Sequence, residues 1–160
     1  MASLGLNIKV DGLSKLQRRL QGLSSRVTDL RPIWGAIAGE FREGEREVFE
    51  KEGAVDGWGQ WAPLDPKYAA RKVKDGFPDI IMVRTGELED SLTGFGPGSI
   101  FRSDPMSMEI GTSVEHAKYH QRAKSPRKRR EPIRVTEEQM EIWGDIIERF
   151  IVESDDAGIS

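Results

Sequence analysis

The sequence predicts an α+β fold, a single domain in which long amphipathic helices pack on a small antiparallel β-sheet. Apolar residues recur at helical spacing near residues 13–23, 32–51 and 137–151. Two short runs with β character flank a turn sequence at Asp104-Pro105. With 160 residues, 37% of them apolar, the chain is long enough to bury one hydrophobic core and too short to form two domains that each bury a core of their own.

The expected domain covers residues 1–152, and residues 153–160 are expected to form an acidic tail that frays. The first element is a half-buried strand, because apolar and polar residues alternate from Leu4 to Val10. A short amphipathic helix follows, since leucines at positions 13, 16, 20 and 23 share one face and basic residues occupy the other.

A second, longer helix begins at Pro32 and ends near Lys51, and residues 24–29 supply helix-capping side chains before it. Its apolar stripe consists of Trp34, Ile37, Phe41, Val48 and Phe49. Glycines at positions 35, 39 and 44 each weaken an isolated helix by about 1 kcal/mol relative to alanine. Two explanations stay open, close packing against a neighbouring element and simple tolerance on a solvated face.

The segment from Glu52 to Leu64 predicts a long structured loop, because glycine, proline and two tryptophans replace the periodic pattern. The tryptophans are Trp58 and Trp61. Binding residues are often carried on loops that a rigid scaffold positions. We therefore expect this loop to be a contact element.

Shorter elements follow the loop. Residues 67–74 are expected to be helical, and the run Ile80–Val83 has β character. Thr85 can then cap a short helix that contains Leu88 and Leu92.

The C-terminal half predicts a hairpin with strands at 99–102 and 106–111, followed by a helix at 114–122 that bears both histidines. The final helix is the clearest element in the chain. Residues Thr136 to Gln139 fit a capping box, and apolar residues at helical spacing follow.

The charge balance excludes a global electrostatic function. Lys plus Arg (24) and Asp plus Glu (27) nearly cancel, so no overall field favours nucleic acid or a membrane. Cysteine is absent, which rules out disulfides and thiolate sites and fits a reducing cytoplasm. Residues 1–10 show no basic leader, and no stretch approaches the roughly 20 apolar residues of a membrane span. We expect the protein to be soluble when made.

The candidates for chemistry are weak. His116 and His120 stand four residues apart and could face one metal, but no third ligand has a diagnostic spacing. The glycine-rich stretch 94–98 precedes a predicted strand instead of a helix, so it does not fit a dinucleotide loop, and no Walker A sequence occurs. We expect no catalytic residue, no metal and no cofactor. A metal-dependent hydrolase at the histidines ranks last among three hypotheses.

Six cations lie within nine positions of one another. They are Arg122, Lys124, Arg127, Lys128, Arg129 and Arg130. Such a stretch can hold phosphates, pair with an acidic protein surface or stay a solvated loop. Because no aromatic residues are interleaved with the cations, we favour a protein partner. A nucleic-acid-binding accessory protein using residues 122–130 is the alternative.

Several short sequence words in the middle and end of the chain resemble the phage virion morphogenesis family, which includes tail-completion proteins of P2-like phages and the corresponding protein of Mu-like phages. They cover roughly residues 58–150 in the family's order. The words are Trp61-Ala62-Pro63-Leu64, Tyr68, Lys72, the run from Ile80 to Leu88, Ser91-Leu92, Ile110-Gly111, the run from Ala117 to Gln121, and Arg130-Glu131-Pro132-Ile133.

The resemblance implies a non-enzymatic structural protein at the head–tail junction of a tailed bacteriophage. Such a protein would form a homo-oligomeric ring in the neck, where six copies would match tail symmetry and twelve would match the portal. We favour six. Implied partners are the head–tail connector and the tail terminator or tube proteins, with contact to packaged DNA left open and no membrane. The expected location is the virion, after assembly in the host cytoplasm.

The expected interface residues are the two loop tryptophans, because aromatic anchors suit buried interface centres, and the basic cluster, because charge complementarity guides docking. These residues are Trp58, Trp61, Arg127, Lys128, Arg129 and Arg130. Arg122 and Lys124 are expected to contact DNA or an acidic partner. The competing interpretation is that the tryptophans fold back onto the core, and it applies more strongly to Trp61.

Overall fold

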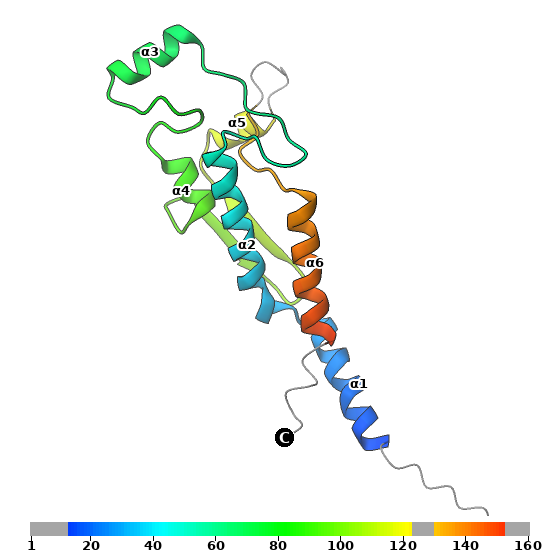
Figure 1. The fold of residues 1–160 in the computed structure, drawn as a ribbon. Helices are drawn as coiled ribbons and strands as arrows, with labels where there is room; N and C mark the ends of the chain where they lie inside the picture. The colour runs from blue at the N-terminus through cyan, green and yellow to red at the C-terminus, as the bar shows by residue number, and fades with distance from the viewer. Residues whose placement is uncertain (1–12, 123–129, 153–160) are drawn as a thin grey trace, which may run out of the picture.

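A computed structural model of the protein describes residues 13–122 and 130–152 (Figure 1). In chain order the elements are α1 (Leu13–Thr28), α2 (Arg31–Glu50), α3 (Pro66–Lys74), α4 (Glu87–Thr93), β1 (Ser99–Ser103), β2 (Met108–Thr112), α5 (Ala117–Gln121) and α6 (Glu137–Val152). The predicted strand at residues 4–10 and the predicted tail at 153–160 lie outside the described residues, so the domain boundaries stay a prediction.

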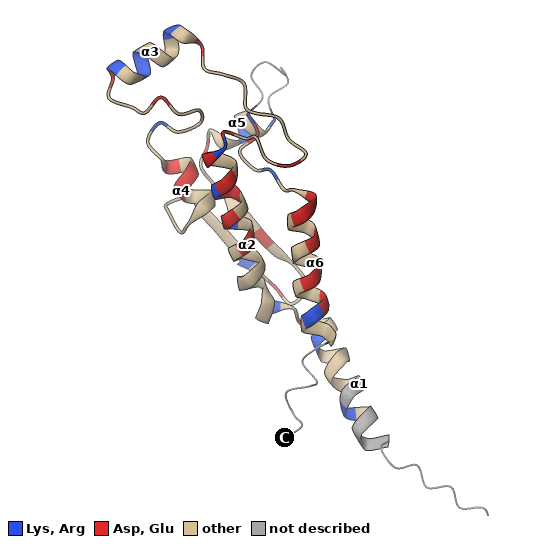
Figure 2. Ribbon diagram, viewed as in Figure 1, with Lys and Arg blue, Asp and Glu red and all other residues tan. Residues whose placement is uncertain are grey.

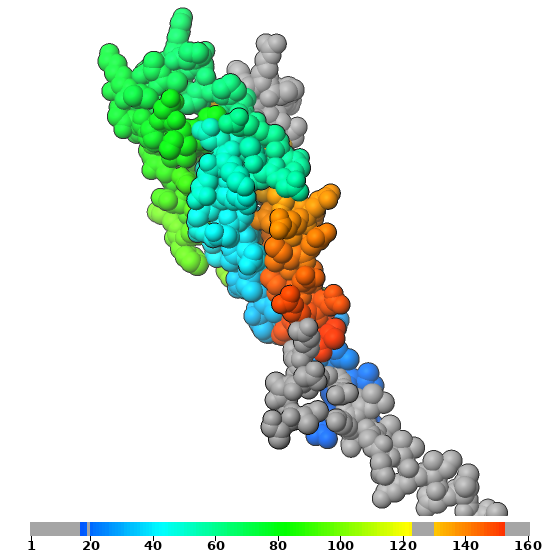
Figure 3. Space-filling model, in the orientation of Figure 1, coloured from blue at the N-terminus to red at the C-terminus, as the bar shows by residue number. Residues whose placement is uncertain are grey.

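The predicted α+β class is confirmed. Helices α2 and α6 lie side by side, and α4 packs against both α2 and the β1–β2 hairpin (Figure 1). The two strands are antiparallel, with Ser99 opposite Thr112 and Ser103 opposite Met108. The molecule is elongated, because α1 extends beyond one end of this body and α3 stands at the other (Figure 3).

The apolar stripe of α2 forms the middle of the core, as its helical spacing predicts. Its N-terminal half, including Trp34 and Ile37, packs against one side of α6. Its C-terminal half, including Phe41, Val48 and Phe49, packs against the tryptophan-bearing loop and α4. Helix α2 therefore joins the α1 end of the molecule to the α3 end.

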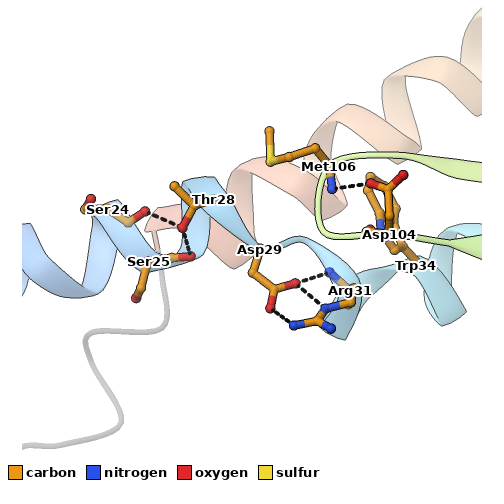
Figure 4. A network of polar contacts seen from close by, with 8 residues as sticks. All are labelled: Ser24, Ser25, Thr28, Asp29, Arg31, Trp34, Asp104 and Met106. Carbon is orange, nitrogen blue, oxygen red and sulfur yellow. Dashed lines mark hydrogen bonds and ion pairs between the residues drawn. The ribbon is translucent and has the colours of Figure 1, made fainter.

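The junction between α1 and α2 is fastened by polar contacts (Figure 4). The Asp29 carboxylate accepts hydrogen bonds from the Arg31 backbone and guanidinium, and the guanidinium lowers the pKa of Asp29 to about 2. The Leu30 N–H donates to the Pro105 carbonyl (2.8 Å), and the Trp34 indole donates to the Asp104 carbonyl (2.8 Å). The tip of the hairpin thus fixes the direction in which α1 leaves the body.

Local capping differs from the prediction at this junction. Residues 24–28 belong to α1, where the Thr28 hydroxyl donates back to the Ser24 and Ser25 carbonyls instead of capping the next helix. The N-cap of α2 is Leu30, which makes no side-chain cap bond. Only Asp29 in the predicted capping stretch acts near the start of α2, through the Arg31 N–H.

The capping box of α6 is confirmed. The Thr136 hydroxyl accepts from the Gln139 N–H (3.2 Å), and the Gln139 side-chain oxygen accepts from the Thr136 N–H (3.0 Å). The amide of Gln139 also lies over Gly44 of α2, where an added Cβ would come within 1.6 Å of Nε2. Gly44 is therefore a close-approach glycine, whereas Gly35 and Gly39 have nothing within 4 Å of an added Cβ.

Two short elements were predicted wrongly. Residues 80–83 form a turn, with a single bridge between Ile80 and Val83, because Met82 has a left-handed φ of 64°. Thr85 does not cap α4. The N-cap is Gly86, whose φ of 84° suits glycine and which makes no side-chain cap bond.

Two other elements agree with the prediction in type but are displaced or shorter. Strand β2 starts at Met108, because the Asp104 carboxylate takes the N–H groups of Met106 and Ser107 in the turn (both 2.8 Å). The histidine-bearing helix is reduced to α5 at 117–121, with His116 at its N-cap.

The glycines of α2 allow a matched stability test. Gly39→Ala should raise the free energy of unfolding by about 1 kcal/mol, because alanine favours the helix and the site is open. Gly44→Ala should give no such gain, because its methyl group displaces Gln139 and costs about 1 kcal/mol of capping. Urea unfolding of the two variants measures the difference. Equal stabilisation of both would contradict the close approach at Gly44.

Candidate functional site

The tryptophan loop, residues 52–64, is fixed to the core by Trp61. This side chain is only 2% exposed, and its ring meets Phe49 edge-on at 5.3 Å between centroids. Its indole donates to the Glu131 carbonyl (2.9 Å), and its backbone N–H donates to the Glu52 carbonyl (2.8 Å). Trp61 thus folds back onto the core of this chain, the alternative that the sequence left open, and its ring is not offered at the surface.

Trp58 lies on the outer side of the same loop. Its side chain is 38% exposed, and its indole donates to the Val135 carbonyl (3.2 Å). The guanidinium of Arg134 lies 5.2 Å from the ring centroid, within reach of a cation–π interaction. Trp58 is therefore ordered by its own chain while part of its ring stays open to a partner. Its interface role stays a prediction.

The arginine segment, residues 130–135, holds the tryptophan loop along its length. Arg134 is buried, and its guanidinium donates to the carbonyls of Gly53 and Gly59. Arg130 donates from Nε to the Ala62 carbonyl (2.7 Å) and from Nη2 to the Pro63 carbonyl (2.8 Å). From the sequence, the tryptophan loop and the basic cluster are predicted to be two separate surfaces. The structure brings Trp58, Trp61 and Arg130 together.

A buried carboxylate lies beneath this contact. Glu45 of α2 is 0% exposed, and its Oε1 accepts from the Arg134 N–H (3.2 Å) while Oε2 has no hydrogen-bond partner. Burial raises the pKa of Glu45 to about 8, although the Arg134 N–H and charge act in the opposite direction. Glu45 was not among the residues predicted from the sequence. Its burial could have been predicted from its spacing, because Glu45 falls four residues after Phe41 in the apolar stripe of α2.

A broad groove opens beside the loop, between α3 on one side and α4 and α5 on the other. Its cavity volume is about 1290 Å³. The lining combines aromatic, aliphatic and cationic side chains. It consists of Pro63, Leu64, Asp65, Tyr68, Lys72, Phe77, Met82, Val83, Arg84, Thr85, Gly86, Glu87, Leu88, His116, Tyr119, His120 and Arg130.

Helix α3 forms one wall of this groove and is tied down through a buried lysine. Lys72 donates from Nζ to the carbonyls of Ile80 (2.7 Å) and Val83, and burial lowers its pKa. The helix itself starts at an Asp65 cap that accepts from two backbone N–H groups. Because Lys72 satisfies the carbonyls of the 80–83 turn, that segment is held in a turn and lines the groove.

His116 and His120 both line the groove. Their ring centroids are 6.4 Å apart, and burial, followed by the charges of Arg130 and His116, lowers the pKa of His120. No cluster of three or more metal-ligating side chains occurs within residues 13–122 and 130–152. The described geometry therefore offers two imidazoles in a groove wall and no third ligand.

The basic cluster is only partly described. Arg122 is the C-cap residue of α5, and Arg130 joins the groove to the loop. Lys124, Arg127, Lys128 and Arg129 lie outside the described residues, so their contacts stay predictions. Among the helices that the structure describes, each is too short or too polar to span a bilayer.

The fold is thus a small α+β domain with a structured loop and a groove at one end of an elongated body. A comparison with protein-family models matches residues 11–145 to the phage virion morphogenesis family. The chain belongs to this family and is a bacteriophage protein of virion morphogenesis, associated with the virion. No curated protein and no solved structure shows a significant match to the chain.

The buried Glu45 predicts how stability changes with pH. Its pKa of about 8 in the folded protein lies above the ordinary 4.5, so the folded chain holds a proton that the unfolded chain releases between those values. Stability should therefore fall as pH rises through this window, by a slope of the order of 1 kcal/mol per pH unit from this group. Glu45→Gln should flatten the slope.

Urea unfolding of the parent and of Glu45→Gln, between about pH 5 and about pH 8, isolates this contribution because all other groups are shared. The two stability curves should approach or cross as pH rises. Parallel curves would show that Glu45 is ionised in the folded protein throughout this range.

Proposed function

We propose that the protein is a structural head–tail junction protein, a neck or tail-completion protein that joins the tail to the head connector. It works by binding and not by catalysis. Copies assemble as a ring, of which six would match tail symmetry and twelve the portal, and we favour six. Its partners are the connector and the tail terminator or tube proteins, and it acts in the neck of the virion after assembly in the host cytoplasm.

The observation that carries this proposal is where the family's sequence words lie in space. Six of the eight family words contribute residues to the groove, and these residues are spread from position 63 to position 130. Every lining residue except Asp65, Phe77 and His116 belongs to a word that resembles the family. A surface assembled from so many separate family words supports a shared binding role for the groove.

The chemistry of the groove suits a protein partner. Tyr68 and Tyr119 are 36% and 63% exposed and supply large amphipathic contacts of the kind enriched in interface hot spots. The Arg84 guanidinium lies 4.5 Å from the Phe77 ring centroid, so a cation is already oriented beside an apolar surface. This combination fits a partner segment that carries an acidic residue next to apolar ones.

Tail joining tests the groove. Tyr119→Ala should fold normally but join heads to tails at least about tenfold less well, because an exposed interface tyrosine is lost. Phe95→Ala is the matched control, since Phe95 is 86% exposed and does not line the groove. Negative-stain microscopy should show rings of the parent protein, and infectious particles formed from separated heads and tails give the joining yield.

Monomeric parent protein that leaves isolated tails unchanged would overturn the proposed function. Equal joining by Tyr119→Ala and Phe95→Ala would show instead that the groove is not the joining surface.

DNA binding measured at several salt concentrations distinguishes the proposed protein-binding role from the nucleic-acid-binding alternative. The triple variant Arg127→Ser, Lys128→Ser, Arg129→Ser leaves out Arg130, because Arg130 holds the tryptophan loop. We expect no salt-dependent binding of the parent to duplex DNA. Steep salt-dependent binding, with a slope that the triple variant reduces by roughly one unit per lost phosphate contact, would favour the nucleic-acid-binding alternative.

A further inference from the structure

Helix α1 carries an apolar stripe that is partly exposed among the residues that the structure describes. Leucines at positions 13, 16, 20 and 23 and Val27 are spaced alternately three and four residues apart, the spacing of a and d positions in a coiled coil. Leu20 is 56% exposed and Val27 is 48% exposed. Leu23 is half-buried, and we call Leu20, Leu23 and Val27 the α1 stripe. Its regular period matches packing against another helix.

Within residues 13–122 and 130–152, the direction of α1 leaves Leu20 and Val27 exposed. Helix α1 extends past the end of α6 instead of lying along it (Figures 1 and 3). Their contact includes a hydrogen bond from Arg26 Nε to the Ile151 carbonyl (3.0 Å), in the last turns of the two helices. The Asp29–Arg31 contacts and the Leu30 hydrogen bond to Pro105 hold α1 in this direction (Figure 4).

Helix α6 presents a second, partly open stripe. Met140, Gly144, Ile147 and Ile151 recur at four, three and four residues. Ile147 borders the face that packs on α2 and is half-buried against it, as Ile151 is half-buried, whereas Met140 and Gly144 are exposed. Met140 is 54% exposed, and Gly144 has nothing within 4 Å of an added Cβ. No residue of α6 is fully buried, although α6 contains seven large apolar side chains between Met140 and Ile151. We call these four residues the α6 stripe.

The two helices are complementary in length and charge. Each has 16 residues, about 24 Å of helix. Helix α1 has four basic residues and no acidic one, whereas α6 has five acidic residues and one basic one. Figure 2 shows acidic residues repeating along α6. Opposite net charges beside two apolar stripes favour pairing of α1 with α6 over pairing of α1 with a second α1.

We propose that α1 of one copy packs along α6 of a neighbouring copy, with the α1 stripe against the α6 stripe. This inference rests on the ring assembly of the proposed function and names the contact that builds the ring. Every copy donates one α1 and accepts another, so the interface is heterologous and closes into a ring when the rotation per copy is a whole fraction of a turn.

Cross-linking between copies tests the contact directly. The chain has no cysteine, so Leu20→Cys and Gly144→Cys each introduce a single thiol. Both positions are at the middle of their helices and meet at the same level whether the helices run parallel or antiparallel. A mixture of the two variants should give mixed disulfide dimers under mild oxidation, whereas Val73→Cys, on the exposed side of α3, should not pair with Gly144→Cys.

Three results would overturn the inference while rings still form. These are the absence of mixed dimers, a preference of Leu20→Cys for disulfide dimers with itself, and, in a double variant that carries both Leu20→Cys and Gly144→Cys, a disulfide within one chain. The second result would indicate that α1 pairs with α1, and the third that α1 folds back onto its own α6.

A steric variant gives a second measurement. Gly144→Gln should keep the fold, because the site is open and glutamine favours helix, but should reduce ring formation at least about tenfold by filling the α6 stripe. Circular dichroism and thermal unfolding check the fold, and analytical ultracentrifugation measures the assembly. The control Val73→Gln should keep the rings. Rings that survive Gly144→Gln would overturn the inference, and a parent that never forms rings would overturn the proposed function as well.

Discussion

The candidate binding groove and the tryptophan loop beside it depend on the hydrogen bonds of one buried arginine, Arg134. A guanidinium inside a protein is costly unless its hydrogen bonds are satisfied, and Arg134 donates to the carbonyls of Gly53 and Gly59. Its guanidinium lies 5.2 Å from the Trp58 ring centroid and 5.9 Å from that of Trp61, between the exposed and the buried side of the loop. Because the arginine binds backbone carbonyls, the loop must follow one path, and that path determines where the groove begins.

The two ends of the molecule have different roles in the proposed function, binding of a virion partner at one end and contact with a neighbouring copy at the other. At one end, the tryptophan loop and α3 are fixed by arginine and lysine side chains that bind carbonyls, so a partner would meet a preformed groove and little ordering entropy would be lost. At the other end, Leu20 and Val27 of α1 are exposed within the described residues. Helix α2 connects the ends through one continuous core. In the proposed assembly, the groove joins the virion partner and α1 joins the neighbouring copy.

The elements predicted correctly from the sequence are those that local interactions determine. The spacing of apolar residues predicts α2 and α6, and the Thr136–Gln139 capping box predicts where α6 starts, because these contacts join residues a few positions apart. The strand predicted at residues 80–83 is wrong, because Lys72 of α3 donates hydrogen bonds to the Ile80 and Val83 carbonyls that a strand would need. The burial of Glu45 was not predicted either, since a carboxylate within an apolar stripe is normally expected to be exposed to solvent.

The fold class, the long helices, the hairpin and, through the family words, the family of the chain could all be predicted from the amino-acid pattern alone. The packing of the whole chain was needed to show that Trp61 is a core residue, that Arg130 binds the tryptophan loop, and that Leu20 and Val27 of α1 are exposed within the described residues. The physical reason is separation along the chain. Arg130 and Ala62 are 68 residues apart, and their contact depends on how the whole core packs, which no local period or capping motif encodes.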